Sequence, residues 1–160
     1  SHYETGEKIP KELVQKLLNA SNFNTGYQCC RQVSFGLLDM AWHTLDTPYE
    51  GDVATFEKKA WERASVLPDV PGTLFGSNFG HIFSGGYAAG YYGYKWAEVL
   101  DADAFALFKK TGIFNKETAE SFRKNILERG NTEEPMSLYV KFRGQEPTVD
   151  ALLERNGIKK

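Results

Sequence analysis

Residues 79–96, FGHIFSGGYAAGYYGYKW, form the stretch around which the rest of the chain is organised. They hold one of the three histidines, four of the eight tyrosines and five of the fifteen glycines. His81, Gly85, Gly86 and Tyr87 fall in a glycine-rich segment, and a tyrosine-rich helix start follows. Core packing alone rarely requires so many polar aromatic residues beside glycine, so the stretch is a candidate functional segment.

The spacing of the tyrosines predicts a row of hydroxyl groups. A helix that begins near Ala88 places Tyr91, Tyr94 and Glu98 on one face, and Tyr87 lies one turn earlier. A tyrosine with a pKa of about 10 keeps its proton at neutral pH and can donate a hydrogen bond to a carbonyl oxygen or oxyanion. The alternative is an aromatic stripe buried against other helices. The adjoining glycines and histidine weaken that alternative without removing it.

Length and composition favour one globular domain. The chain has 160 residues, 41% of them hydrophobic, which is enough for a sizeable core. A formal charge of -2 argues against nucleic acid or an anionic membrane as the main partner. No apolar run is long enough to span a membrane. The first residues, SHYETGEKIP, lack both an initiator Met and the apolar core of a signal peptide, so we expect a chain processed or cut from something longer.

The only cysteines, Cys29 and Cys30, are adjacent. Neighbouring cysteines rarely form a disulfide because the bond needs a specific geometry. A metal or redox pair is conceivable, but the amphipathic surroundings favour plain buried thiols. The absence of a disulfide framework fits a reducing compartment, and we expect a cytoplasmic location with a periplasmic one as the alternative.

Helical periodicity predicts an all-α fold, a single helical unit over residues 1–160 with one long Gly/Pro-rich loop. Residues 67–86 contain two prolines and five glycines, too many for a regular element, so this loop is functional or covered by a partner surface. Asp52 is the expected cap of the third helix. The expected helices cover about 10–20, 25–45, 53–66, 88–110 and 115–130, with shorter ones over 136–142 and 148–156.

Several kinds of chemistry are missing from the chain. His2, His43 and His81 are scattered without an HExxH motif, so one helix cannot supply two imidazoles to zinc, and we expect no metal site. No serine lies in a GxSxG elbow, and the glycine-rich segment lacks the Lys-Ser/Thr of a phosphate-binding loop. The residues therefore offer hydrogen-bond donors and a substrate-facing loop, but no nucleophile and no metal.

The stretch that holds these donors is part of a resemblance to a known family that covers essentially the whole chain. FGHIFSGGYAAGYYGYKWAEVLDADAF, FRKNILERGN and LYVKFRGQEPTVDALLERNGI, with HYETGEKIP, NFNTGYQ and LLDMAWHTL upstream, resemble the zinc oligopeptidases of the thimet oligopeptidase family. Within that family the sequence is most similar to the bacterial peptidyl-dipeptidase (Dcp) branch. The H-x5-Y-x6-Y core with its double glycine is the most specific part of the match.

The resemblance implies the helical C-terminal portion of a zincin-like oligopeptidase, with a deep channel between two helical halves. Zinc would be held by an HExxH helix and a further glutamate, all before the point where this chain begins, so residues 1–160 would be part of a larger catalytic domain. By motif position, Tyr94 would donate to the carbonyl oxygen as it becomes an oxyanion. Tyr87 and His81 would bind the substrate backbone or help to stabilise that charge.

The same resemblance assigns substrate-binding residues. Gly85, Gly86 and Gly90 would let the loop close over bound peptide, and Tyr91 would line the cleft. Lys95 departs from the family pattern, where an apolar residue is expected, and would face solvent or the pocket for a peptide carboxylate.

The leading hypothesis is therefore the C-terminal part of a zinc metallopeptidase that hydrolyses short peptides and releases C-terminal dipeptides. Its expected partners are the peptide substrate and the N-terminal remainder of the same protein. The isolated fragment should bind no catalytic zinc and cleave nothing, and its exposed apolar side chains should promote self-association. The alternative is a non-catalytic helical peptide-binding or scaffold module, and an upstream HExxH motif would decide between the two.

Overall fold

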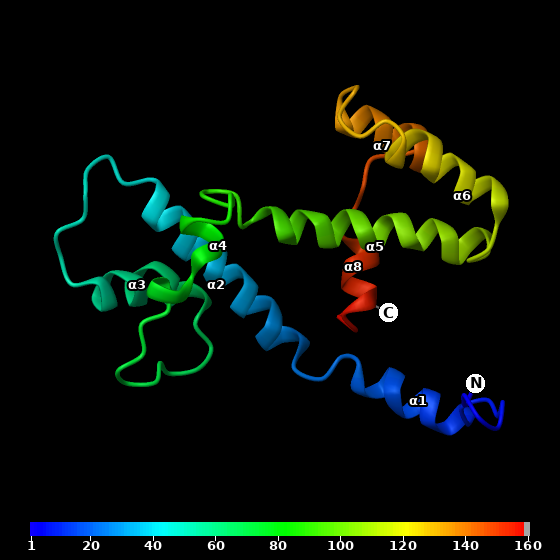
Figure 1. Cartoon of the computed structure of the whole chain (residues 1–160), viewed down its shortest axis with the longest axis horizontal. Coiled ribbons are helices and arrows are strands. Elements are labelled where there is room, and N and C mark those ends of the chain that lie inside the picture. The colour runs from blue at the N-terminus through cyan, green and yellow to red at the C-terminus, as the bar shows by residue number, and fades with distance from the viewer. Residues whose placement is uncertain (159–160) are drawn as a thin grey trace. The chain divides into compact units, whose positions relative to one another are not determined.

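Figure 1 shows a computed structural model of the chain, in which residues 1–158 are described. Helices, turns and loops make up these residues and no strand occurs among them, which confirms the expected all-α class. The chain divides into two compact units, one formed by Ser1–Tyr91 and the other beginning at Tyr92. The larger catalytic domain expected to contain residues 1–160 as a single unit stays a prediction.

The first unit is built around the second half of its longest helix. Phe35 and Leu38 of that helix pack against Phe79 and Ile82 from the later loop region, and all four are buried. Partly buried aromatic residues such as Trp42 surround them. The helical elements of this unit are α1 (Lys11–Ala20), α2 (Thr25–His43), α3 (Val53–Trp61), the 3₁₀ turns η1 (Glu62–Ala64) and η2 (Gly76–Asn78), and α4 (Gly80–Phe83).

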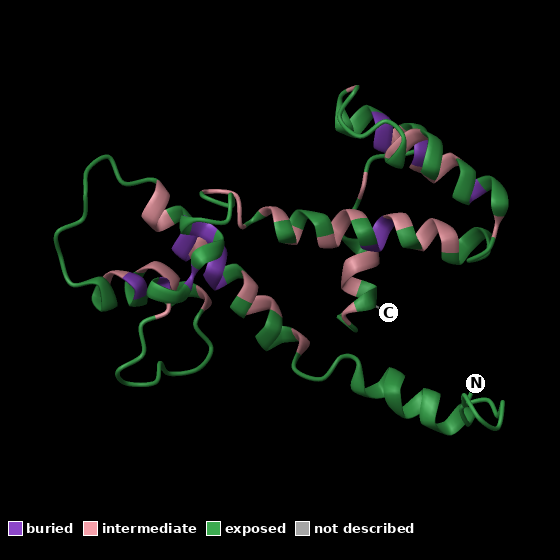
Figure 2. Cartoon of the chain, in the orientation of Figure 1, coloured by how far each residue is buried: buried purple, intermediate pink, exposed green. Residues whose placement is uncertain are grey.

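Helix α1 has no buried residue, and Figure 2 shows it exposed along its length. Its apolar side chains Leu13, Leu17 and Leu18 lie at the surface. Cys29 and Cys30 are free thiols and only half-buried, which corrects the expectation of buried ones. The reason is local, because the buried residues of α2 lie between Ser34 and Asp39, beyond the two cysteines.

Two predicted boundaries of the first unit change in the structure. Asp52 caps α3 as expected, with its side chain accepting a hydrogen bond from the Thr55 amide at 2.7 Å. The helix ends at Trp61 rather than near residue 66, and η1 follows it. Pro68 disfavours helical geometry at the residue before it, which agrees with this early end. Helix α2 likewise ends at His43, two residues before the predicted end.

The predicted loop over residues 67–86 is only partly irregular. It contains the 3₁₀ turn η2 and the short helix α4, so His81 lies on a helical turn rather than in a mobile loop. The fourth long helix, α5 (Gly93–Thr111), begins at Gly93 and not near Ala88. Both corrections come from contacts with residues far away in the sequence, which are described with the site.

The second unit consists of α5, α6 (Lys116–Phe122), the π-helical turn η3 (Arg123–Leu127), α7 (Pro135–Arg143) and α8 (Asp150–Arg155). Helices α6 and α7 lie on one side of α5 and α8 on the other (Figure 1). Leu127, the last residue of this π-helical turn, is exposed. No helix of residues 1–158 is both long and apolar enough to cross a membrane.

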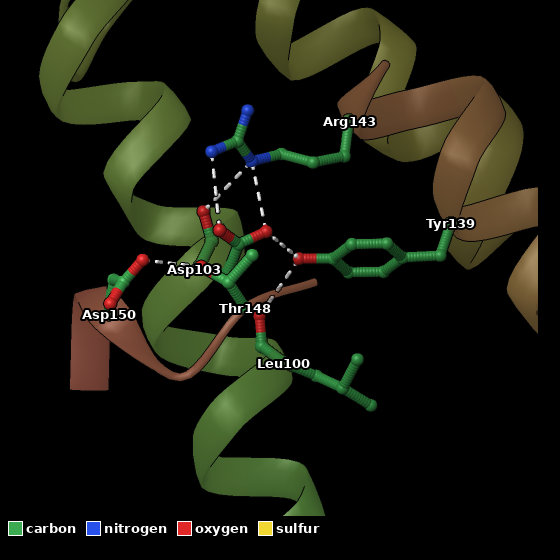
Figure 3. Close-up of polar contacts among 6 residues, drawn as sticks. All are labelled: Leu100, Asp103, Tyr139, Arg143, Thr148 and Asp150. Atoms are coloured by element: carbon green, nitrogen blue, oxygen red, sulfur yellow. Dashed lines mark hydrogen bonds and ion pairs between the residues drawn. The ribbon is translucent and has the colours of Figure 1, made fainter. Parts of the chain in front are cut away.

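A buried ion pair joins α5 to α7 in this unit (Figure 3). The Arg143 guanidinium bonds both carboxylate oxygens of Asp103, with Nε 3.0 Å from Oδ2 and Nη2 3.2 Å from Oδ1. The Tyr139 hydroxyl donates to Oδ2 of the same carboxylate at 2.6 Å. Because a buried charge is tolerated only when it is paired and hydrogen-bonded, these three side chains depend on one another.

Candidate functional site

A tight turn after α4 brings His81 and Tyr87 together. The amides of Ser84 and Gly85 both donate to the Gly80 carbonyl at 2.8 Å, and the Tyr87 amide donates to the His81 carbonyl at 3.2 Å. The ring centroids of His81 and Tyr87 consequently lie 5.5 Å apart. Both side chains are exposed, so the turn presents an imidazole and a phenol side by side.

Glycine is required at two positions of this turn. Gly86 has φ +81°, a left-handed conformation that side chains disfavour. A Cβ at Gly85 would lie 2.9 Å from the carbonyl oxygen of His81. At Gly90 a Cβ would meet only ordinary contacts, the nearest at 3.5 Å. Turn geometry thus accounts for Gly85 and Gly86, and the substrate-binding role of all three glycines stays a prediction.

Asp39 of α2 holds the chain just before α5. Its side chain is completely buried, Oδ1 accepts the amide of Ala89 at 2.9 Å, and Oδ2 accepts the amide of Tyr91 at 2.8 Å. Ala89 has φ +53°, a left-handed conformation that costs a non-glycine residue free energy. Nδ1 of His43, one turn after Asp39, lies 2.8 Å from Oδ1.

These bonds explain why α5 starts late. A helix that began near Ala88 would need right-handed geometry at Ala89, and Asp39 instead holds this residue in the left-handed region. Tyr91 therefore precedes α5, whereas Tyr94 lies in its first turn. The predicted continuous helical face with Tyr87, Tyr91 and Tyr94 is wrong, because a turn separates the first two residues from the helix.

Tyr91 is fixed in the first unit by its ring and its hydroxyl. The ring packs edge-on against Phe35 and Phe79, with centroids 5.8 Å and 5.2 Å away. The hydroxyl donates to Oε1 of Gln32 at 3.1 Å. Burial raises the pKa of the Tyr91 phenol above its ordinary value, although the Gln32 hydrogen bond and the charge of Arg31 act in the opposite direction. The phenol accordingly keeps its proton at neutral pH.

A second buried carboxylate holds the earlier part of the loop region. Glu57 of α3 accepts the amide of Phe75 at 3.2 Å and the amide of Gly76 at 2.9 Å. These amides lie at the start of the 3₁₀ turn η2, which leads directly into α4 and His81. Glu57 therefore supplies the acceptor that orders this part of a segment predicted to be irregular.

Tyr94 and Lys95 belong to the second unit, in the first turn of α5. The Tyr94 side chain is 37% exposed. Lys95, the departure from the family pattern, forms an ion pair with Glu98, with Nζ 2.7 Å from Oε2. The Lys95 ammonium thus has a carboxylate neighbour on its own helix.

Sequence reasoning missed Asp39 and Glu57. Each is an acidic residue within an amphipathic helix, and Asp39 directly follows the apolar pair Leu37 and Leu38. A lone carboxylate in such a run is a signal for a buried acceptor, since a buried charge must find partners. The partners themselves lie 50 and 52 residues away from Asp39 and 18 and 19 residues away from Glu57, beyond any local pattern.

No group of three or more histidine, cysteine, aspartate or glutamate side chains that could hold a metal ion occurs among the described residues. Nδ1 of His43 lies 2.9 Å from the backbone oxygen of Asp39, and the His43 ring lies beside that of Phe83, with centroids 5.6 Å apart. The donors and acceptors of residues 1–158 thus do not make a zinc site by themselves.

Comparison with known proteins places this geometry in context. The family model described as Peptidase family M3 matches residues 1–158. Oligopeptidase A of Salmonella typhimurium is 50% identical over 99% of this chain and 23% of its own length. Dipeptidyl carboxypeptidase of Escherichia coli is 42% identical over 98% of this chain and 23% of its own length. Saccharolysin of Saccharomyces cerevisiae is 34% identical over 99% of this chain and 22% of its own length.

The chain therefore spans about a quarter of the length of these curated relatives. Identity to oligopeptidase A exceeds identity to dipeptidyl carboxypeptidase, so the expected closeness to the peptidyl-dipeptidase branch is not confirmed. The wider resemblance, to the family that contains these oligopeptidases, is confirmed by the family match and by the relatives together.

Proposed function

The chain belongs to peptidase family M3, and from that premise we propose that it is the C-terminal part of a metallopeptidase that hydrolyses short peptides. Its contribution to the reaction is a set of hydrogen-bond donors together with a glycine-containing turn. The observation that carries this proposal is the exposed turn on which His81 and Tyr87 lie 5.5 Å apart, followed by Tyr94 at the start of α5.

The hydroxyl of Tyr94 donates to the scissile carbonyl oxygen as negative charge develops on it. A neutral phenol suits this role because it keeps its proton at working pH and needs no charge of its own. A donor that strengthens its bond in the transition state raises kcat, and removing one such donor typically lowers the rate ~10²–10³-fold.

His81 and Tyr87 bind the substrate backbone or share in stabilising the oxyanion. Both residues lie at the surface, and the Gly85-Gly86 turn keeps side chains away from the backbone there. Tyr91 lines the substrate cleft. Gly85, Gly86 and Gly90 allow the segment to adjust around bound peptide.

Peptidases of this family depend on zinc, and the described residues do not provide its ligands. The metal and the residues that hold it are therefore assigned to the N-terminal remainder of the protein, which is the partner we propose for this chain. Every role given above belongs to residues of the chain itself. On its own, the fragment is expected to be inactive.

Release of C-terminal dipeptides is the finer part of the proposal. One relative is named dipeptidyl carboxypeptidase and another oligopeptidase A, and both match nearly the whole chain. Product analysis separates the two modes. A blocked C-terminus should stop dipeptide release, whereas internal cleavage should continue.

The decisive experiment compares full-length wild-type protein with Tyr94→Phe in the presence of zinc, on a short peptide substrate. The expected result is a fall in kcat of about 10²-fold with little change in KM, because the hydroxyl acts in the transition state. Tyr92→Phe is the matched control, since Tyr92 is an exposed neighbour with no assigned role. Unchanged kinetics in Tyr94→Phe would show that this hydroxyl does not act in the transition state and that the tyrosines serve for packing.

A further inference from the structure

We infer that Asp39 is a positioning residue, which sets the geometry of the segment that carries Tyr87 and Tyr91 without touching substrate. The inference rests on the proposed function, because it concerns how the donors of that site are held. Its basis is the pair of bonds from one buried carboxylate to the amides of Ala89 and Tyr91.

A buried carboxylate requires compensation for every oxygen that leaves water. Oδ1 of Asp39 accepts the Ala89 amide and also lies 2.8 Å from Nδ1 of His43, and Oδ2 accepts the Tyr91 amide. Bonds from amides to an ionised carboxylate are stronger than those to a neutral acceptor. Asp39 thus accepts hydrogen bonds from two backbone amides, those of Ala89 and Tyr91, which are separated by a single residue.

The residues that Asp39 holds belong to a turn whose backbone conformation is unfavourable by itself. Ala89 adopts φ +53°, and such a conformation persists in a non-glycine residue only when its surroundings fix it. The Gly90 amide also donates to the Tyr87 carbonyl at 2.9 Å, which closes the turn. Loosening the Asp39 bonds would release the turn and displace the Tyr87 side chain relative to His81.

Helix α2 also restrains the same segment through a side chain. Gln32 lies seven residues before Asp39, so both project from one face of the helix, and it accepts the Tyr91 hydroxyl at 3.1 Å. Tyr91 is accordingly held at its backbone by Asp39 and at its hydroxyl by Gln32. Both restraints on this segment therefore come from the same helix, α2.

Hydrogen exchange of backbone amides tests the anchor directly, in the full-length protein and without any need for activity. Asp39→Asn keeps the shape of the side chain but removes its charge and turns one acceptor into a donor that faces an amide. Exchange at Ala89 or Tyr91 should become at least about 10-fold faster. Glu57→Gln is the matched control: it should speed exchange at Phe75 and Gly76 and leave residues 89–91 unchanged.

A double-mutant cycle tests whether the anchor acts through Tyr87. Alone, Asp39→Asn should lower kcat/KM by about 10–100-fold, with the amount of folded protein matched to wild type. In a Tyr87→Phe background the same substitution should cost less than about 3-fold, because the donor that it misplaces is already absent. A merely structural role would give the same factor in both backgrounds.

The possible outcomes separate the two proposals. Unchanged exchange at residues 89–91 in Asp39→Asn, or equal losses of kcat/KM in both backgrounds, would overturn the positioning role while Tyr94→Phe could still support the peptidase site. Wild-type protein that hydrolyses no peptide would overturn the proposed function and this role with it. Faster exchange together with non-additive kinetics would establish Asp39 as a positioning residue.

Discussion

Glu57 and Gly76 fit together only because glycine has no side chain. Oε1 of Glu57 accepts the Gly76 amide at 2.9 Å, and a Cβ added to Gly76 would overlap that same oxygen. Both residues are buried, so the carboxylate has no solvent to move into. Gly76→Ala should therefore break both amide bonds of Glu57 and lower the free energy of unfolding by about 2–4 kcal/mol. Urea denaturation measures this loss.

Gly26→Ala is the matched control for that substitution. Gly26 lies in the first turn of α2, has no atom within 4 Å of an added Cβ and does not have a positive φ. Alanine should be neutral there or stabilise the chain by about 0.4–1 kcal/mol, because it restricts the unfolded chain. Equal stability of the two variants would contradict the close fit between Glu57 and Gly76.

Removing Arg143 from its buried ion pair with Asp103 should cost far more stability than removing Arg155 from its surface pair with Asp101. Arg143→Met leaves the buried Asp103 carboxylate without its cation and should cost about 3–5 kcal/mol. Arg155→Met removes the partner of Asp101, which is exposed, and should cost at most about 1 kcal/mol. Denaturant unfolding of both variants tests the contrast, and similar losses would contradict it.

The Tyr139 phenol makes the stability of the second unit depend on pH in the alkaline range. Burial raises the pKa of its phenol well above the ordinary value, the hydrogen bond and charge of Asp103 add to this, and Arg143 acts against it. Above pH of about 10, the unfolded chain loses this proton while the folded chain keeps it. The unfolded state then binds fewer protons, so the stability contribution that is complete below about pH 10 declines as pH rises further.

Tyr139→Phe should remove this part of the decline. Free energies of unfolding measured between about pH 8 and about pH 11 should fall less steeply in the variant than in wild type. Tyr92→Phe, at an exposed position, should keep the wild-type slope. A Tyr139→Phe profile parallel to the wild-type one would show that this phenol does not set the slope.

Local signals carried the sequence-based predictions that succeeded. Asp52 caps its helix by accepting the amide three residues later, which is a rule of short range. The closeness of His81 and Tyr87 also follows from a short turn.

Contacts between distant residues explain where other sequence-based predictions were wrong. The start of α5 depends on Asp39, which is 50 residues away from Ala89, and the order within the loop region depends on Glu57. Local propensity at Ala88 and Ala89 favours helix, but two bonds to a buried carboxylate outweigh it. The roles of Tyr94 and of the glycines stay predictions, since they concern a substrate.

The exposed apolar residues of α1 should make the 160-residue chain self-associate. Leu13 and Leu17 are 42% and 63% exposed and lie one turn apart, so they form an exposed apolar stripe on a helix that has no buried residue. Leu17→Lys should weaken the association in sedimentation velocity runs over a range of concentrations. Gln15→Lys adds the same charge at an exposed polar position of α1 and should leave the association unchanged. A wild-type chain that stays monomeric at every concentration would show that this stripe does not drive association.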